Sequence, residues 1–480
     1  MVHDEFSYLL AADTFARGRL TNPTHPLWIH FESIHIIQRP TYQSKYPPGQ
    51  GLALAAGQAL TGYPIVGAWL AAAAACIAVV WMLRSALPLP WAIFGGLLAA
   101  LHPVVLRWSR DYWGGAVAML AGALLLGGLE RVIRQGRARG ALTMGLGIAL
   151  LAITRPYEGF VLAILALVRL VVWLLGDGPG RRALAARLAL CLIVTAAPGV
   201  AWLAYYNFRV TGDALKLPYV EHMDQYQVAP LFVWQAPRPA PPYRHEVLRA
   251  FHASEELVSI QGHDTVLGFL RWSRDKLADL GWRYTVLGAL APLLVALAWA
   301  VPSDRHLGAS AAMLVLFVLG LLPTNGAQAH YAAPAFGLFL LLAAAGARSL
   351  WNREWRGWRV GRLIVVMAVA LQAAAFVAVV RLEAARRPLW WTAQRARVVA
   401  EVRQRAARSL IVVRYGPLAD GHAEWVYNQA DIDGAPVVWA RAMTPERDQA
   451  LVEYFRDRQV WRLDVNGADV ALRAEPSRAP

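Results

Sequence analysis

The chain has 480 residues, of which 57% are hydrophobic and only 16% are charged, whereas globular domains carry roughly 25% charged and about 45–50% apolar residues. This imbalance excludes an ordinary soluble enzyme and indicates a helical protein that crosses a membrane several times. The formal net charge of +15 comes mostly from arginines in short loops, so it is interpreted as membrane topology and not as nucleic-acid binding.

The first 62 residues are mixed in character and are expected to lie outside the membrane. Residues 5–17 place apolar side chains, Phe6 and Phe15 among them, near one helical face, which predicts a short amphipathic helix lying on the membrane surface. No basic leader followed by an apolar stretch opens the chain, so no signal peptide is predicted. We therefore expect a further membrane span before Met1 in the natural gene.

Ten apolar runs come next, and each predicts a membrane helix. The runs cover residues 64–83, 88–106, 113–129, 141–153, 159–175, 188–206, 284–301, 308–322, 331–347 and 363–380. A polar stretch, residues 207–282, separates the first six runs from the last four. The predicted division is therefore an external segment (1–62), six helices (63–206), a large external loop (207–282), four helices (283–380) and a soluble domain (381–480).

Arginines gather in alternate loops between these runs and predict the orientation. The arginine-rich loops carry Arg84, Arg131, Arg134, Arg137, Arg139, Arg181, Arg182, Arg187, Arg305, Arg348, Arg353, Arg356, Arg359 and Arg362. By the positive-inside rule these loops are cytoplasmic. Both termini and the large loop then face outward, which in the inner membrane of a bacterium is the periplasm.

The last hundred residues are soluble in character and predict a small α/β domain. The segments SLIVVRYG, APVVWAR and RQVWRLDV have the composition of short strands. Between the last two, TPERDQALVEYFRD predicts a helix with Thr444 as N-cap and Pro445 in its first turn. The domain is interpreted either as a lid or docking module or as a stabilising appendage.

Two adjacent carboxylates, Asp4 and Glu5, are the first candidates for chemistry. An ionised carboxylate can accept a proton from an attacking hydroxyl or amine, and a lysine nearby, such as Lys45, holds it ionised. The alternative for the pair is capping of the helix that begins near Phe6. The alternative for Lys45 is an interfacial lysine whose ammonium group reaches water.

At these residues the chain resembles a known family. An Asp-Glu pair, an aromatic residue (Tyr8) three positions on, an amphipathic segment and Lys45 before two prolines resemble the GT-C superfamily of lipid-linked glycosyltransferases, in particular the protein O-mannosyltransferases and the lipid A aminoarabinose transferases. The resemblance implies a mainly α, polytopic transmembrane GT-C-like bundle, with Asp4 as catalytic base and Glu5 beside it in substrate binding. Tyr46 between the lysine and the prolines, the missing first helix and the C-terminal domain depart from the family pattern.

Two basic and aromatic groups on the same side are candidates for binding the donor. Arg155 lies in a very short turn that the positive-inside rule should leave without basic residues, and an arginine there suits a phosphate. Arg110 is a second candidate of the same kind. His330 and Tyr331, before Pro334, match a place where the resemblance implies contact with the donor. Interfacial anchoring is the alternative for these groups.

The histidines are not spaced as metal ligands. Those of the large loop, His222, His245, His252 and His263, suit either a mobile cover over the site or a solvated linker. His25, His30 and His35 are interpreted as unrelated loop residues. No metal site or cofactor is predicted, although the carboxylates could hold a divalent metal loosely. Cys76 and Cys191 lie within apolar runs and are expected to be unreactive.

Nucleotide-binding loops, serine-nucleophile motifs and nucleic-acid modules are absent from the sequence. The prediction is an inverting glycosyltransferase that takes a sugar from a polyprenyl-phosphate donor in the bilayer and passes it to a glycan, lipid or protein acceptor at the outer face. A transporter or flippase of a lipid-linked sugar is the first alternative, but it would need charged residues in the middle of spans. A non-catalytic envelope assembly or sensor protein is the second.

Overall fold

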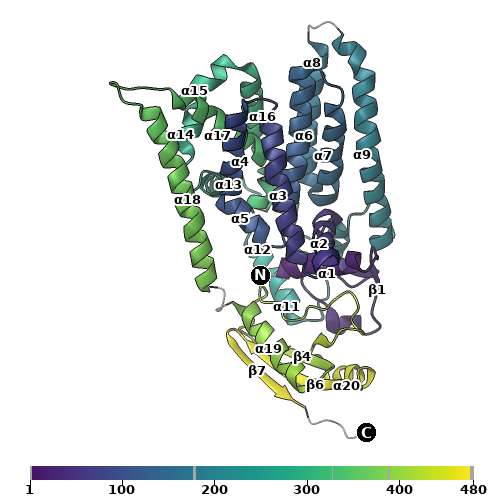
Figure 1. Ribbon diagram of the computed structural model, residues 1–480. Coiled ribbons are helices and arrows are strands. Elements are labelled where there is room, and N and C mark those ends of the chain that lie inside the picture. Colours follow the sequence, from purple (N-terminus) through teal and green to yellow (C-terminus); the bar gives the residue numbers. More distant parts are fainter. Residues whose placement is uncertain (1–2, 177–179, 327, 387–389, 476–480) are drawn as a thin grey trace.

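The computed structural model describes residues 3–176, 180–326, 328–386 and 390–475. Upright helices form a bundle, helix α1 (His3–Ala16) lies across one end of it, and a small domain with a sheet lies beyond α1 (Figure 1). The N-terminal segment is therefore enclosed between the bundle and the C-terminal domain.

Each predicted apolar run contains helix in the structure, although residues 285–290 of the run 284–301 form turns. The bundle contains α3 (Pro64–Leu83), α4 (Leu89–Ala100), α5 (Pro103–Arg110), α6 (Gly115–Gln135), α7 (Gly140–Thr154), α8 (Pro156–Leu175), α9 (Arg181–Thr211), α14 (Ala291–Val295), α15 (Leu297–Ala300), η3 (Val301–Ser303), α16 (Arg305–Leu321), η4 (Ala329–Ala335), α17 (Phe336–Trp351) and α18 (Val360–Arg386). Among the described residues, six helices are long and apolar enough to cross a membrane. The pair α4 and α5, bent by 56°, can add a seventh. The chain is thus an integral membrane protein, and the other predicted runs form shorter apolar helices.

Two glycines allow the close contacts that bring the outer ends of these helices together. A Cβ on Gly49, in α2 (Pro48–Thr61), would lie 2.2 Å from Oγ1 of Thr154, at the end of α7. A Cβ on Gly122 in α6 would lie 1.8 Å from the carbonyl oxygen of Pro334 in η4. Both distances are shorter than any real contact of a side chain, so only glycine fits. The first contact brings the α7–α8 turn close to the N-terminal segment, and the second brings η4 close to α6.

The bundle also contains charges that the sequence analysis did not place inside it. Glu130 of α6 forms ion pairs with Arg134 at 2.7 Å and with Arg169 of α8 at 2.6 Å. Arg134 in turn meets Asp304 at 3.2 Å. The four charges neutralise one another, so this cluster ties α6, α8 and α16 together.

The N-terminal segment differs from the prediction of a helix on the membrane surface. Helix α1 is buried on nearly every side, because it packs against α2 on one side and against the C-terminal domain on the other. Its polar residues are satisfied internally, as where Ser7 Oγ donates to the carbonyl oxygen of His35 at 2.7 Å. The rest of the segment holds η1 (Trp28–Phe31) and an antiparallel sheet in the order β1 (Asn22–Pro23), β3 (Thr41–Ser44), β2 (Ile36–Ile37).

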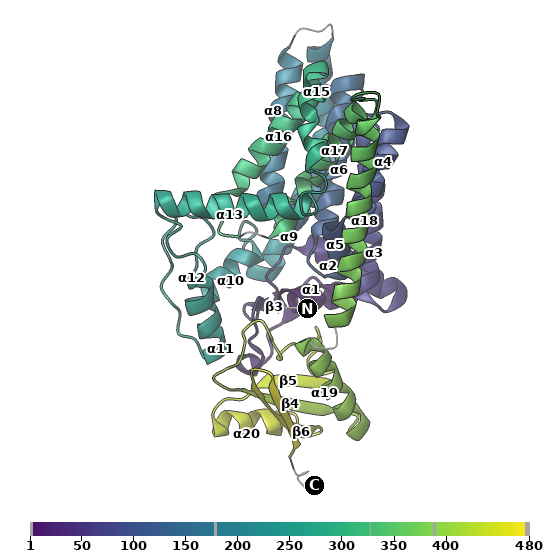
Figure 2. The ribbon, with the colours of Figure 1, turned by 90° about the vertical axis from the view of Figure 1, so that its left-hand side faces the viewer.

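The large polar loop, residues 207–282, is itself partly helical. It contains α10 (Pro218–Tyr226), α11 (Glu246–Arg249), the π-helical turn η2 (Ala250–Glu255), α12 (Glu256–Val258) and α13 (Val266–Tyr284). Helix α13 runs across the direction of the bundle helices, and α10 to α12 lie beneath it (Figure 2). The helices of this loop therefore lie beside the N-terminal segment, where α10 contacts β2.

The C-terminal domain is α/β and contains the three predicted strands. Its sheet has the order β5 (Val437–Arg441), β4 (Ser409–Tyr415), β6 (Gln459–Asn466), β7 (Asp469–Ala474), and β4 is parallel to both β5 and β6. The predicted helix is α20 (Pro445–Tyr454); Thr444 is at its N-cap position, although its side chain makes no capping hydrogen bond. Strand β7 and helix α19 (Trp391–Arg405) were not predicted.

The C-terminal domain shares one hydrophobic core with the N-terminal segment. Leu10, Phe31 and Ile36 pack with Leu410 and the buried face of α20. Hydrogen bonds cross the same boundary: the Tyr42 hydroxyl donates to the carbonyl oxygen of Asn428 at 2.9 Å, and the Ala430 amide donates to the Asp13 carboxylate at 2.8 Å. The domain is thus part of the structure that holds α1 in place.

Candidate active site

A cavity of about 410 Å³ opens where the N-terminal segment, the α7–α8 turn, the large loop and the α16–α17 connection meet. Six of the eight predicted site residues line it, namely Asp4, Tyr8, Lys45, Arg155, His330 and Tyr331. They come from four separate parts of the chain, and the close contacts at Gly49 and Gly122 bring these parts together.

Asp4 lies in the first turn of α1 and faces this cavity. Its carboxylate accepts a short hydrogen bond from the Tyr46 hydroxyl and lies 3.2 Å from His3 Nδ1 and 3.4 Å from His35 Nε2. Burial lowers the pKa of His3 to about 4 and that of His35 well below its ordinary value. Both rings are therefore neutral near pH 7 and act on the carboxylate as dipoles and not as cations.

Lys45 enters the same cavity from the end of β3. Its side chain is buried, with the ammonium group 4.9 Å from the ring centre of Tyr219 and 5.3 Å from that of Tyr46. Among the described residues, no side chain or carbonyl forms a hydrogen bond or ion pair with Nζ. Burial lowers the pKa of this lysine to about 8. A buried ammonium group without an anionic partner is costly, so this position favours a negatively charged ligand.

Arg155 supplies a second cation, from the turn between α7 and α8. One of its nitrogens, Nη2, donates to the carbonyl oxygen of Trp113 at 3.3 Å, and the guanidinium lies 5.1 Å from the ring centre of Tyr331. His330 packs its ring edge on Trp113 at 5.0 Å. The tryptophan and Tyr331 thus orient the guanidinium, and its remaining donors are available to a ligand in the cavity.

Tyr8 lies between the acidic and basic parts of the cavity. Its ring stacks on that of Tyr46 at 4.4 Å. Tyr46 donates to Asp4 and also flanks Lys45, so the stacking of Tyr8 supports the residue that contacts both charged groups.

Glu5 and Arg110 lie elsewhere. Glu5 is buried against the start of the loop after α5, where its carboxylate accepts from the Tyr112 amide at 3.2 Å. Arg110 forms an ion pair with Glu383 of α18 at 2.6 Å. Neither residue lines the cavity. Glu5 contacts the loop after α5 and Arg110 contacts α18, so both hold parts of the protein together and do not face a ligand.

Sequence reasoning missed several residues of the cavity. His35 was interpreted as an unrelated loop residue, which is wrong: its backbone has a φ of +65°, and this left-handed conformation turns the ring toward Asp4. Glu256 also lines the cavity and pairs with His252 Nδ1 at 2.7 Å. No spacing in the sequence points to either residue, because these contacts arise from an unusual backbone turn and from the helical turns of the large loop.

Three of these groups could hold a metal ion. Ligand atoms of His3, Asp4 and His35 all lie within 4.8 Å of one another. The low pKa values keep both imidazoles neutral, as metal ligation requires. Nδ1 of His35 is buried and has no hydrogen-bond partner among the described residues. Two imidazoles and a carboxylate fit a divalent transition metal such as zinc.

The bundle, the crosswise N-terminal helix and the small C-terminal domain agree with the mainly α, polytopic fold that the sequence resemblance predicted, and solved structures share this fold. ArnT from Cupriavidus metallidurans in the apo state aligns over 99% of this chain and 95% of its own, with 13% identity and a TM-score of 0.57. The same protein bound to undecaprenyl phosphate aligns over 96% and 88%, with 14% identity and a TM-score of 0.54. No protein-family model and no curated protein sequence matches the chain.

Proposed function

We propose that the protein is an inverting glycosyltransferase that moves a sugar from a polyprenyl-phosphate donor to an acceptor at the outer face of a bacterial inner membrane. The observation that carries this proposal is the buried ammonium group of Lys45, which faces a cavity shared with Asp4, Glu256 and Arg155 and forms no hydrogen bond or ion pair with any described residue. A lipid-linked phosphate would supply a partner anion for this group. The similarity of the fold to ArnT, whose complex holds undecaprenyl phosphate, supports this choice of lipid carrier.

In the proposed reaction, Asp4 accepts the proton of the acceptor hydroxyl or amine as that group attacks the anomeric carbon. The bond between this carbon and the phosphate oxygen breaks, and its electron pair leaves with the polyprenyl phosphate. Lys45 and Arg155 stabilise the negative charge that develops on the phosphate. A single displacement of this kind inverts the configuration at the anomeric carbon. The proton on Asp4 then passes to water.

A divalent cation held by His3, Asp4 and His35 would supply positive charge next to the acceptor. The imidazoles of His3 and His35 would orient the carboxylate whether or not a metal is bound, because both approach it within hydrogen-bonding or near hydrogen-bonding distance. The acceptor is proposed to be a glycan, lipid or protein of the cell envelope, reached from the periplasmic side.

The assignment of the phosphate contacts can be tested by binding. Lys45→Gln and Arg155→Gln should each weaken the binding of undecaprenyl phosphate to the full-length protein in nanodiscs by roughly 10- to 100-fold, since a hydrogen bond to a charged group contributes about 1.5–3 kcal/mol. Arg110→Gln is the matched control, because Arg110 pairs with Glu383 outside the cavity. Equal weakening in all three variants would show that only the overall charge matters and would remove the proposed site.

Binding of the donor phosphate should weaken at high pH because of Lys45. Burial lowers its pKa to about 8, so the ammonium form prevails at pH 7 and is lost as the pH rises above 8. The second ionisation of a phosphate monoester, near pH 6, is already complete there. Affinity for undecaprenyl phosphate should therefore fall by about tenfold per pH unit above pH 8. Lys45→Arg should keep its affinity up to pH 10; a decline that persists in this variant would assign the titration to another group.

A further inference from the structure

The sheet of the C-terminal domain is covered on one face and only partly covered on the other. Alternate residues of each strand point to opposite faces, and Ile411, Trp461 and Leu463 pack on the α19 side. On the second face, α20 and the N-terminal segment cover the beginning of the strands, where Leu410 and Val460 are buried. The continuation of this second face toward β7 is hollowed and lined by arginines.

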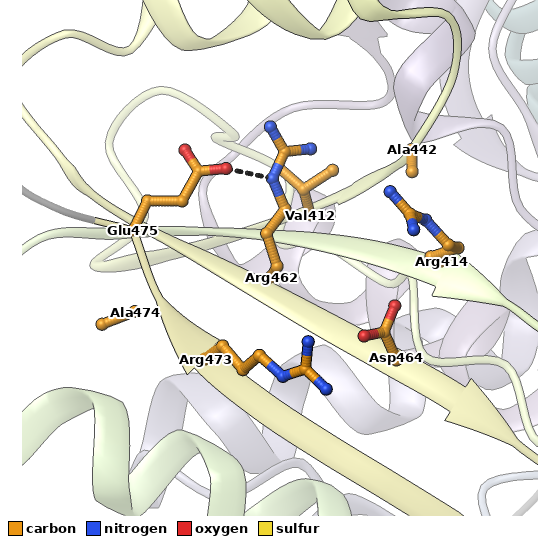
Figure 3. A pocket seen from close by; sticks show the side chains of 8 residues that line it. All are labelled: Val412, Arg414, Ala442, Arg462, Asp464, Arg473, Ala474 and Glu475. Carbon is orange, nitrogen blue, oxygen red and sulfur yellow. Dashed lines mark hydrogen bonds and ion pairs between the residues drawn. The ribbon is translucent and has the colours of Figure 1, made fainter.

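We call this hollow the arginine pocket, and it has a volume of about 290 Å³. It is lined by Val412, Arg414, Ala442, Arg462, Asp464, Arg473, Ala474 and Glu475 (Figure 3). The short side chains of Val412, Ala442 and Ala474 leave space between the longer charged ones. The pocket is built entirely from the C-terminal domain and shares no residue with the cavity at Asp4.

The strand register places the charged residues in two rows. Arg462 on β6 lies opposite Val412 on β4 and opposite Arg473 on β7. One step further along, Arg414 lies opposite Asp464. Three guanidinium groups thus lie at the same hollow as the carboxylates of Asp464 and Glu475, as Figure 3 shows.

Only one of the three arginines is neutralised. Arg462 pairs with Asp448 at 2.9 Å and, more closely, with Glu475. Arg414 and Arg473 are exposed, and neither forms an ion pair or a side-chain hydrogen bond with any residue that the structure describes. Asp448 and Glu475 already balance Arg462, so Arg414 and Arg473 are the two guanidinium groups of the pocket that remain available to a ligand.

We infer that the arginine pocket binds an acidic saccharide. The forked guanidinium groups of Arg414 and Arg473 suit two oxygens of a phosphate or carboxylate. Asp464, between them, can accept a hydrogen bond from a sugar hydroxyl. The volume suits one monosaccharide unit. Identifying this saccharide as part of the acceptor rests on the proposed function, whereas the binding itself does not.

Saturation-transfer NMR on the full-length protein in detergent tests the inference. The probes are glucose 1-phosphate and glucuronate, which separate phosphate from carboxylate recognition, with glucose as the neutral reference. Acidic probes should bind and glucose should not. Arg414→Gln with Arg473→Gln should weaken the binding of the acidic probes at least tenfold. Arg403→Gln with Arg456→Gln, which removes two exposed arginines of the same domain, should leave it unchanged. All proteins carry Lys45→Gln, so that binding of phosphate at the other cavity does not contribute.

Unchanged binding in the Arg414 and Arg473 double variant would overturn the inference, and so would an equal loss in the Arg403 and Arg456 control. Binding of glucose as strong as that of the acidic probes would overturn it as well. Because both arginines are exposed and neither forms a side-chain hydrogen bond or ion pair with a described residue, loss of folding is not expected in the double variant, and circular dichroism checks this. Asp4→Asn, which tests the proposed function, should leave binding at the arginine pocket unchanged. A failure of the proposed function can therefore be distinguished from a failure of saccharide binding at this pocket.

Discussion

Replacing Asp4 with Asn should reduce sugar transfer by roughly 100- to 10,000-fold while the protein remains folded, because the variant loses a general base and little else. An asparagine has the same shape and can still accept the hydrogen bond that the Tyr46 hydroxyl donates to Asp4. It cannot accept the proton of the acceptor. The measurement is mass spectrometry of envelope glycans and lipids from a strain lacking the gene, complemented with either the wild type or the variant.

Asp13→Asn is a matched control within the same helix. The Asp13 carboxylate accepts hydrogen bonds from Arg17 at 3.2 Å, from Gln58 at 3.1 Å and from the Ala430 amide at 2.8 Å, and it does not line the cavity. Its loss should lower the thermal stability of the protein and leave the turnover per folded molecule nearly unchanged. Full transfer activity in Asp4→Asn would remove the proposed base. Disappearance of that variant from the membrane would instead support a capping role for Asp4.

Those parts of the structure that depend on composition could be predicted from the sequence. A run of some 15–20 apolar residues has few choices in a bilayer, since its backbone groups must bond to one another, and each of the ten runs contains helix. The grouping of Lys45 with Arg155 and His330 could also be anticipated. All three lie outside the apolar runs, in segments that the arginine distribution assigns to the same outer side of the membrane.

The direction in which each side chain of a helix points was harder to predict. Asp4 and Glu5 are adjacent in sequence, but successive residues of a helix point about 100° apart. One carboxylate therefore faces the cavity while the other meets the Tyr112 amide. Arg110 and Arg155 were both predicted to bind a phosphate, but Arg110 forms an ion pair with Glu383 of α18. These choices depend on which neighbour each side chain meets, and a single sequence does not contain that information.

The C-terminal domain shows the same limit on a larger scale. Its strands could be recognised from composition, but its role could not, because the apolar residues of α1 have the pattern of a helix at a membrane surface. In the structure these residues, Leu10 among them, complete a core with β4 and α20. Removing the domain would expose that core and release the helix that bears Asp4. Deletion of residues 381–480 should therefore disturb the cavity at Asp4 as well as remove the domain.

The strength of this connection should be visible at Arg441, a buried residue at the end of β5. Its guanidinium pairs closely with Glu424, and its Nε donates to the carbonyl oxygen of Glu32 at 2.6 Å. Arg441→Leu would leave the Glu424 carboxylate buried without its cation. Breaking one side of such a pair typically costs about 3–5 kcal/mol. The variant should therefore show a much lower unfolding temperature by tryptophan fluorescence and should lose transfer activity together with folded protein.

Two further variants separate the ion pair from the rest of the contact. Arg447→Leu, at an exposed position of α20, should leave the unfolding temperature near that of the wild type. Arg441→Leu combined with Glu424→Leu should regain part of the loss, since replacing both members of a buried pair with apolar groups removes the unpaired charge. If Arg441→Leu instead unfolds like the wild type, the C-terminal domain docks through its apolar contacts alone. Asp4 would then be held mainly by the packing of α1 on α2.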